Sequence, residues 1–168
     1  MKRNIPNNLK IISESTFQNC KKKLINVSIP ESVTTIGISC FSGCESIELI
    51  NIPKSVTTIY STPFLGCKSL KSISVDSDNT KYSSVDDVLF DKTVTNLIAY
   101  PIDKDITEYS VPNTVTTITG YSFAYSLKLT TINIPSSVTS ISSSTFQYSE
   151  NIPTINIDKA MNSIRYYP

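Results

Sequence analysis

The sequence predicts a mainly β solenoid of about six stacked units, each of roughly 23 residues and two short strands, with one β-hairpin inserted between units. The first observation is a run of residue types that recurs at a fixed step. This step takes Pro30 to Pro53 and Phe41 to Phe64. A fixed period of 20 to 50 residues is the signature of a repeat solenoid. The second observation is that apolar and polar residues alternate within each copy, which is the period of a half-buried strand.

The copy that begins at Leu24 shows what each unit contains. Its first strand should bury Val27 and Ile29 and end at Pro30, because proline cannot donate a ladder hydrogen bond. The second strand is the run Ser-Val-Thr-Thr-Ile, whose β-branched residues suit a pleated surface. A turn that contains Phe41 completes the unit. One such unit cannot bury its apolar side alone, so neighbouring units must share a continuous core.

Six first strands are expected along the chain. They should start at Leu24, Ile47, Leu70, Ile106, Leu129 and Ile152. The unit before them lacks a first strand, because the chain enters at Ile5-Pro6 in the middle of the pattern. The sequence therefore predicts a single domain over residues 1–168, with an insertion at about 76–105.

The regular step fails once, where 36 positions instead of 23 separate Val75 from Val111. Two strands of a hairpin are expected near 85–90 and 97–100. Because 13 extra residues do not fit inside a unit whose neighbours keep the step, we expect this hairpin to project from the solenoid. Its apolar residues should cover the neighbouring repeats and its charged residues should stay exposed; the two sets are Val88, Phe90, Leu97 and Tyr100, and Asp86, Asp87, Asp91 and Lys92.

The order L-x-x-I-x-I-P-x-S-V-T-x-I, followed by F-x-G-C, resembles the BspA-like leucine-rich repeats of bacterial and protozoan proteins. Residues 24–44, 47–67 and 129–146 carry the resemblance, with Ser149 in place of the last cysteine. Residues 82–101 look like the hairpin that this family inserts between repeats, although Asp87 stands where a glycine is usual. The resemblance implies a leucine-rich repeat solenoid with its first strands on the concave face. It also implies binding rather than chemistry, often at the cell surface.

The composition argues against catalysis and against a nucleic-acid partner. The chain has no histidine, only four glycines, and none of the usual phosphate-binding or nucleophile motifs, so we expect no enzyme activity, no catalytic residue and no cofactor. Its net charge of +1 does not predict a basic stripe for nucleic acid. The acidic stretch from Asp76 to Asp87 lacks the glycine and glutamate of an EF-hand loop, so no metal site is expected.

The expected compartment depends on which feature is given weight. No apolar run is long enough to span a membrane and no secretory signal is recognisable, so we expect no membrane insertion. Cys20, Cys44 and Cys67 share one register and should stack as buried free thiols, which, with Cys40, favours a reducing compartment such as the cytoplasm. The family resemblance favours the cell surface instead, and localisation stays open between the two.

Tyr125 and Tyr148 stand where two other copies have Gly43 and Gly66. A tyrosine is strained at positive φ, so we expect an ordinary right-handed backbone at this position.

The expected function is a non-enzymatic protein–protein interaction module that uses the solenoid surface, in the manner of a surface adhesin. The alternatives are a structural protein whose units associate end to end and an intracellular scaffold. The partner is a protein of unknown identity, and the insertion is expected to determine its choice. Joint replacement of the insertion's Asp87, Asp91 and Lys92 by alanine should then weaken binding without changing stability. The candidate partner-binding residues are Asp87, Asp91, Lys92, Glu48, Asn51, Lys71, Thr131 and Asn133.

Overall fold

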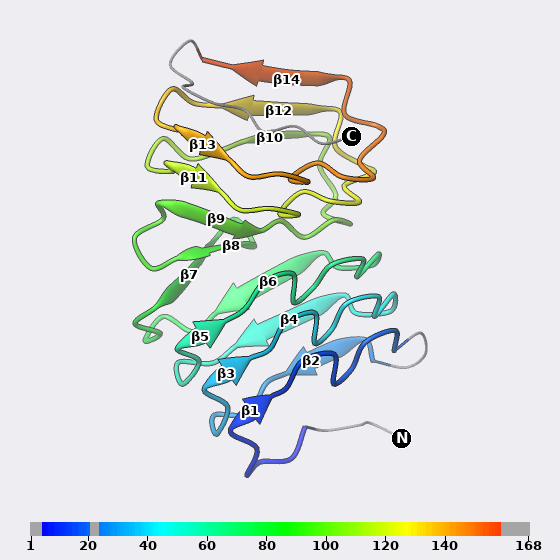
Figure 1. The fold of residues 1–168 in the computed structure, drawn as a ribbon, viewed down its shortest axis with the longest axis vertical. Helices are drawn as coiled ribbons and strands as arrows, with labels where there is room; N and C mark the ends of the chain where they lie inside the picture. Colours follow the sequence, from blue (N-terminus) through cyan, green and yellow to red (C-terminus); the bar gives the residue numbers. More distant parts are fainter. Residues whose placement is uncertain (1–4, 21–23, 159–168) are drawn as a thin grey trace.

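The computed structural model describes residues 5–20 and 24–158 as a stack of units, each with a first strand, a second strand and a turn-rich third side (Figure 1). The first strands are β2 (Asn26–Ser28), β4 (Leu49–Ile52), β6 (Ser72–Val75), β10 (Glu108–Ser110), β12 (Thr131–Ile134) and β14 (Thr154–Ile157). The second strands are β1 (Ile11–Ile12), β3 (Thr35–Ile36), β5 (Thr58–Ile59), β9 (Asn96–Ala99), β11 (Thr117–Ile118) and β13 (Ser140–Ile141). The predicted solenoid of about six two-stranded units is confirmed.

Each first strand begins two residues later than the sequence predicts. β4, for example, begins at Leu49, whereas Ile47 lies fully buried in the turn before it. The apolar residue that opens each sequence copy therefore fills a corner of the core and does not pair in the sheet.

Neighbouring units pair in parallel, one repeat apart. Val27 lies opposite Ile50, and Ile50 lies opposite Ile73. All three side chains are buried, so each first strand contributes one apolar row to the shared core. Burial of a side chain of this size stabilises the fold by about 1.5–3 kcal/mol, which explains why a stack holds together when a single unit would not.

The turn-rich side adds a stack of aromatic rings to the core. The Phe41 ring lies between Phe17 and Phe64, with ring centroids 5.2 and 6.0 Å apart. Phe41 is fully buried and Phe64 is 5% exposed, as the sequence predicts. In the second half of the chain, Phe123 stacks on Tyr100, which belongs to the insertion.

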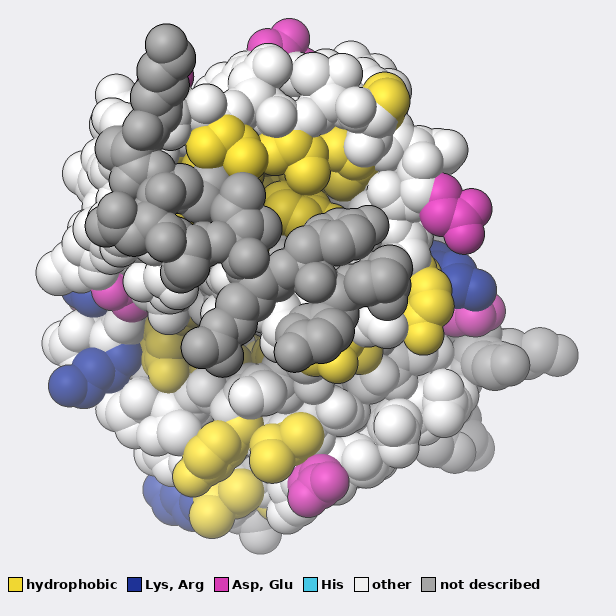
Figure 2. Space-filling view, turned by 45° about the horizontal axis from the view of Figure 1, so that its top comes forward, with side chains coloured by type: hydrophobic (Ala, Val, Ile, Leu, Met, Phe, Trp, Pro, Cys, Tyr) yellow, Lys and Arg dark blue, Asp and Glu magenta, His cyan; other side chains and the backbone are white. Residues whose placement is uncertain are grey.

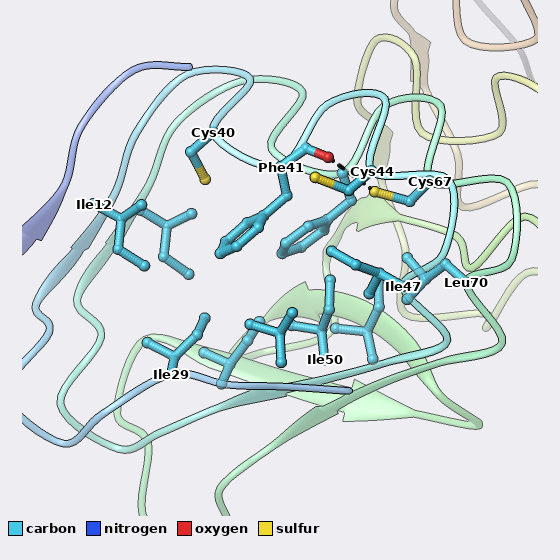
Figure 3. Close-up of a cluster of buried hydrophobic side chains, with 14 of the residues drawn as sticks. Ile12, Ile29, Cys40, Phe41, Cys44, Ile47, Ile50, Cys67 and Leu70 are labelled. Atoms are coloured by element: carbon cyan, nitrogen blue, oxygen red, sulfur yellow. Dashed lines mark hydrogen bonds between the residues drawn. The ribbon is translucent and has the colours of Figure 1, made fainter. Parts of the chain in front are cut away.

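The cysteine that ends each F-x-G-C motif donates a hydrogen bond to the preceding unit (Figure 3). The Cys44 thiol donates to the carbonyl of Phe17 at 2.9 Å, and Cys67 donates to Phe41 at 3.1 Å. Both cysteines are free and buried, and burial raises the pKa of the Cys44 thiol to about 11. The thiols therefore stay protonated and act as donors. Ser149 replaces the cysteine because its hydroxyl donates the same bond, to Phe123 at 2.6 Å.

The expectation of a right-handed backbone at Tyr125 and Tyr148 is wrong. Their φ angles are 64° and 58°, in the same region as Gly43 at 70°. The Tyr125 amide donates to the Gln147 carbonyl at 3.0 Å, as the Gly43 amide does to its neighbouring unit. This ladder holds the backbone in place whichever side chain is present. A left-handed tyrosine costs about 1–2 kcal/mol, and stacking of the two rings, at 4.7 Å between centroids, offsets part of it.

The insertion does not project from the solenoid, and that expectation is also wrong. It forms three strands, β7 (Tyr82–Val85), β8 (Val88–Asp91) and β9, which lie between the two halves of the stack (Figure 1). β7 and β8 pair antiparallel through a two-residue turn, and β9 pairs with β8 on one side and parallel with β11 on the other. The extra residues form a layer between two units, so neither neighbour has to lengthen.

β8 divides the hydrophobic core into two clusters. Leu89 packs with the cluster formed by the units before the insertion, whereas Val88 and Phe90 pack with the cluster formed by those after it. All three side chains are fully buried. The predicted burial of the insertion's apolar residues is confirmed, including Leu97 and Tyr100, but they fill the interior instead of covering an outer surface.

We expect Phe41→Ala to lower the free energy of unfolding by about 3–5 kcal/mol, because it empties a fully buried aromatic site between two other rings. Urea unfolding followed by circular dichroism measures the loss. Ile38→Ala, in the same unit but 43% exposed, is the matched control and should change stability by less than about 0.5 kcal/mol. Equal losses in the two variants would contradict the assigned core.

Candidate functional site

The outward side chains of the first strands form a polar face, which we call the first-strand face. Asn133 links three units on it, because its amide donates to Ser110 at 3.0 Å and to Glu108 at 2.8 Å and its carbonyl oxygen accepts from Asn156 at 2.7 Å. In the first half, the Ser74 hydroxyl donates to Asn51. Amide and hydroxyl groups held in rows can bind an extended polar ligand without rearranging.

Threonines directly before the second strands are already engaged in hydrogen bonds. Thr34 donates its hydroxyl to the Lys10 carbonyl at 3.2 Å, and Thr116 donates to the Thr95 carbonyl at 3.3 Å. Each bond joins one unit to the unit before it. This threonine row therefore supports the stack with hydroxyls alone, whereas the first-strand face also carries amide and charged side chains and is the better candidate for binding.

The structure divides the predicted site residues between two places. Glu48, Asn51 and Lys71 lie on the first-strand face before the insertion, and Thr131 and Asn133 lie on it after the insertion. The remaining three belong to the insertion and do not lie together. Asp87 is in the turn before β8, whereas Asp91 and Lys92 follow at the far end of that strand, roughly 13 Å away for four extended residues.

The β7–β8 turn brings Asp87 to β6. Asp86 and Asp87 have φ angles of 48° and 65°, the pair of positive values that a type I′ hairpin turn requires. The Asp87 carbonyl accepts the Ile73 amide at 3.0 Å, and its carboxylate accepts Lys104 at 2.9 Å and Ser72 at 2.7 Å. Hydrogen bonds from Lys104 and then Ser72 lower the pKa of Asp87. Asp87 therefore joins the insertion to the first-strand face.

Asp91 has a structural role. One carboxylate oxygen accepts the amides of Thr95 and Asn96 at 2.7 and 2.9 Å, and the other accepts the hydroxyls of Thr93 and Thr95 at 3.0 and 2.6 Å. Burial opposes ionisation, yet these bonds hold the pKa of Asp91 below its ordinary value. The side chain is only partly exposed, so the expectation that it is free on the surface is wrong.

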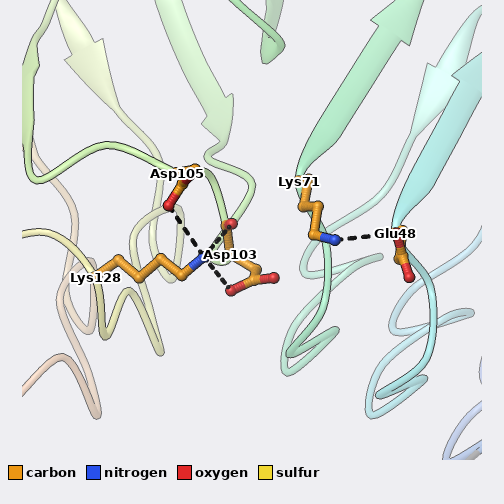
Figure 4. A network of polar contacts seen from close by, with 5 residues as sticks. All are labelled: Glu48, Lys71, Asp103, Asp105 and Lys128. Atoms are coloured by element: carbon orange, nitrogen blue, oxygen red, sulfur yellow. Dashed lines mark hydrogen bonds and ion pairs between the residues drawn. The ribbon is translucent and has the colours of Figure 1, made fainter.

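Charged residues form small groups where the insertion meets the first-strand face (Figure 4). Lys128 pairs with Asp103 at 2.9 Å and with Asp105 at 3.6 Å, while Lys71 pairs with Glu48 at 3.1 Å on the other side of the insertion. Beside the first group is an open depression of about 610 Å³. Its lining residues are Asp105, Ile106, Thr107, Glu108 and Lys128.

Sequence reasoning missed the residues that join the insertion to its neighbours. Tyr82 was not predicted as a core residue, yet it packs against the first core cluster and its hydroxyl accepts the Ile59 amide at 2.8 Å. The buried Asn79 donates to the Pro53 and Val56 carbonyls at 2.8 and 3.0 Å. The sequence feature that could have indicated these residues is the 36-residue step. It implies that no regular strand follows β6, so other groups must form hydrogen bonds with its edge.

The remaining surface carries little charge. On the face in Figure 2, acidic and basic side chains occur in small separate groups, and hydrophobic side chains are visible in several patches. Within residues 5–20 and 24–158, no group of His, Cys, Asp or Glu is arranged to hold a metal ion. Over the same residues, we find no helix of a length and hydropathy that would cross a membrane.

A stack of parallel strands with an open polar face defines a repeat protein that presents an extended surface. The chain belongs to the BspA type leucine-rich repeat family. The family profile, described as a BspA type leucine rich repeat region of six copies, matches residues 2–106 and 99–168. Proteins built from such repeats are generally non-enzymatic binding modules.

Solved structures of bacterial proteins share the fold. A leucine-rich repeat protein from Eubacterium ventriosum is 30% identical, with a TM-score of 0.75 over 92% of this chain and 47% of that one. The pneumococcal vaccine antigen PcpA is 27% identical, with a TM-score of 0.76 over 91% and 44%. A leucine rich cell surface protein from Faecalibacterium prausnitzii is 26% identical, with a TM-score of 0.67 over 86% and 44%. The chain thus spans less than half the length of these proteins. A search of curated proteins gives no significant match.

We expect Asp91→Ala to lower the free energy of unfolding by about 2 kcal/mol, because two backbone amides and two hydroxyls lose a charged acceptor. The matched control is Lys92→Ala, whose exposed ammonium makes one bond to the Ser77 carbonyl, and which should cost less than about 0.5 kcal/mol. Urea midpoints give both values. Indistinguishable midpoints for the two variants would show that Asp91 is a free surface residue after all.

Proposed function

We propose that the chain is a protein-binding module of a cell-surface protein and that its first-strand face, together with the Asp87 turn, contacts the partner. The observation that carries the proposal is the contrast between the two strand faces. Threonine hydroxyls beside the second strands donate to backbone carbonyls of the preceding unit, whereas the first-strand face presents amide and charged side chains that bond to one another, among them the exposed Asn51 and the partly exposed Asn133. Most of the candidate residues lie on that face.

The chain's relatives support this role. One relative of known structure is described as a leucine rich cell surface protein, and another as a vaccine antigen, which fits display on a bacterial surface. The face mixes amide, hydroxyl and paired charged groups, and a polar surface of this kind suits contact with another protein. The insertion lies between the two halves of the first-strand face. A ligand that binds across both halves must therefore pass Asp87.

The proposal predicts that Asn51→Arg combined with Thr131→Arg reduces partner binding at least about tenfold. Two long cations would block the face on both sides of the insertion without opening the core, since both side chains point outward. The immobilised wild-type protein is crosslinked in an extracellular-matrix extract, and the partners that it captures are identified. Their affinities for the wild type and for the variant are then measured by interferometry.

Thr57→Arg with Thr139→Arg is the control, because it places the same charges on the second-strand face at two exposed positions. The control should bind as the wild type does. Partners lost equally from both variants, or from neither, would remove the first-strand face as the binding surface.

End-to-end association is the second candidate role. The observation in its favour is that Ile155 and Ile157 of β14 lie in register with the buried Ile132 and Ile134 yet are 36% and 38% exposed. Units that stack end to end would raise the mass with concentration, and light scattering from about 10 µM to 1 mM measures this. A constant monomer mass over this range excludes the role.

A further inference from the structure

Four strands, β5, β6, β10 and β11, have an edge that faces the insertion. The insertion forms hydrogen bonds with three of these edges. The β5 edge is met by Tyr82, whose hydroxyl accepts the Ile59 amide at 2.8 Å. The β11 edge is met by β9, which pairs with it directly. The β6 edge is met twice, because the Ile73 amide donates to the Asp87 carbonyl and the Val75 amide donates to the Ser84 hydroxyl at 3.1 Å.

The fourth edge, that of β10, is left open. β10 pairs with β12 on one side, and the described residues supply no strand on its other side. Thr107 accepts from Thr130, and Val111 donates to Asn133, so these positions bond toward β12. In a strand, successive amides point to opposite sides, and the amides of Glu108 and Ser110 therefore point away from β12.

Nothing in the described part of the chain accepts the amide of Glu108 or Ser110. Both residues are exposed, as is Thr107 before them. A strand edge without a partner is a template for a further strand. Over the residues that the structure describes, the same insertion forms hydrogen bonds to the edges of β5, β6 and β11, but it forms none to the edge of β10.

The surroundings of the β10 edge favour an occupant with positive charge. The depression of about 610 Å³ lies along the start of this strand and is lined by Asp105 and Glu108, with Lys128 already paired to Asp103 and Asp105. The Asp105 side chain is 99% exposed, so its pairing at 3.6 Å leaves most of its surface free.

We propose that the open edge of β10 binds an extended segment of a protein partner as an added strand, with lysine or arginine at alternate positions facing Asp105 and Glu108. Main-chain bonds to Glu108 and Ser110 supply affinity, and the carboxylates select a basic segment. This inference rests on the proposed function, because it names the part of the first-strand face that takes the partner and the chemistry of the segment taken.

The probe is a blocked synthetic peptide, Thr-Lys-Val-Lys-Val-Lys-Thr, titrated into the ¹⁵N-labelled chain at low salt. Amide hydrogen exchange at Glu108 and Ser110 should slow at least about tenfold on binding, since each amide gains an acceptor. A peptide with glutamate for lysine should bind at least about fivefold more weakly, and the difference should shrink in 0.5 M salt. The lysine peptide with N-methylated amides should not bind.

Two variants at one position separate main-chain pairing from side-chain contact. Ser110→Pro removes the amide that faces the open edge and leaves the main-chain bonds to β12, losing there only the hydroxyl that accepts from Asn133. It should therefore abolish peptide binding while the thermal midpoint stays within a few degrees. Ser110→Ala loses the same hydroxyl but keeps the amide, so its affinity for the peptide should stay close to that of the wild type. If Ser110→Pro does not fold, the exchange rates and the N-methylated peptide decide the question on the unmodified chain.

Binding of the lysine peptide without protection of Glu108 and Ser110, equal binding by Ser110→Pro, or no binding at millimolar concentration would each overturn the inference. The proposed function fails separately. If a partner is lost from the Asn51→Arg, Thr131→Arg variant but is held equally by Ser110→Pro and the wild type, the first-strand face binds partners and the β10 edge does not. If both variants hold the partner, both proposals fall.

Discussion

A parallel strand carries hydrogen-bonding groups on both of its sides, and this constraint determines how the solenoid is built. Each unit satisfies one side by pairing with the unit before it and depends on the next unit for the other. A regular repeat meets this need automatically. Wherever the repeat is interrupted, other groups must take the place of the missing strand. In this protein the residues between β6 and β10 do so, with a hydroxyl from Tyr82, a hydroxyl from Ser84 and a carbonyl from Asp87.

The sequence predicted those features that depend on period and polarity. The 23-residue step located the strands, and the alternation within each copy identified buried residues such as Val27 and Phe41. Features that depend on one particular hydrogen bond were not accessible in this way. Asp91 accepts four hydrogen bonds only because the residues after it fold back over its carboxylate. The sequence Asp-Lys-Thr-Val-Thr is equally compatible with an Asp91 side chain that points to solvent.

Two wrong expectations share a physical origin, which is that neighbouring units constrain the chain more strongly than local preference does. The insertion was expected to leave the stack because its length exceeds the step, but its apolar residues can be buried on both sides of β8 only inside the stack. Tyr125 was expected to avoid positive φ, but its amide must reach the next unit. In both cases contact between units decides the conformation, and at Tyr125 it outweighs a local cost of about one or two kcal/mol.

The division of the core by β8 has a consequence for how the chain reaches its folded state. Contacts in a repeat protein are mostly between nearest neighbours, so the units before β7 and those after β9 can each nucleate without the other. β8 is different, because Leu89 is buried only when the first half is formed and Phe90 only when the second is. Substitutions at Leu89 therefore report on assembly of the units before β7, and substitutions at Phe90 report on assembly of the units after β9. β8, with the neighbouring β9, whose Leu97 and Ile98 also pack in different clusters, thus couples two nucleation sites into one cooperative transition.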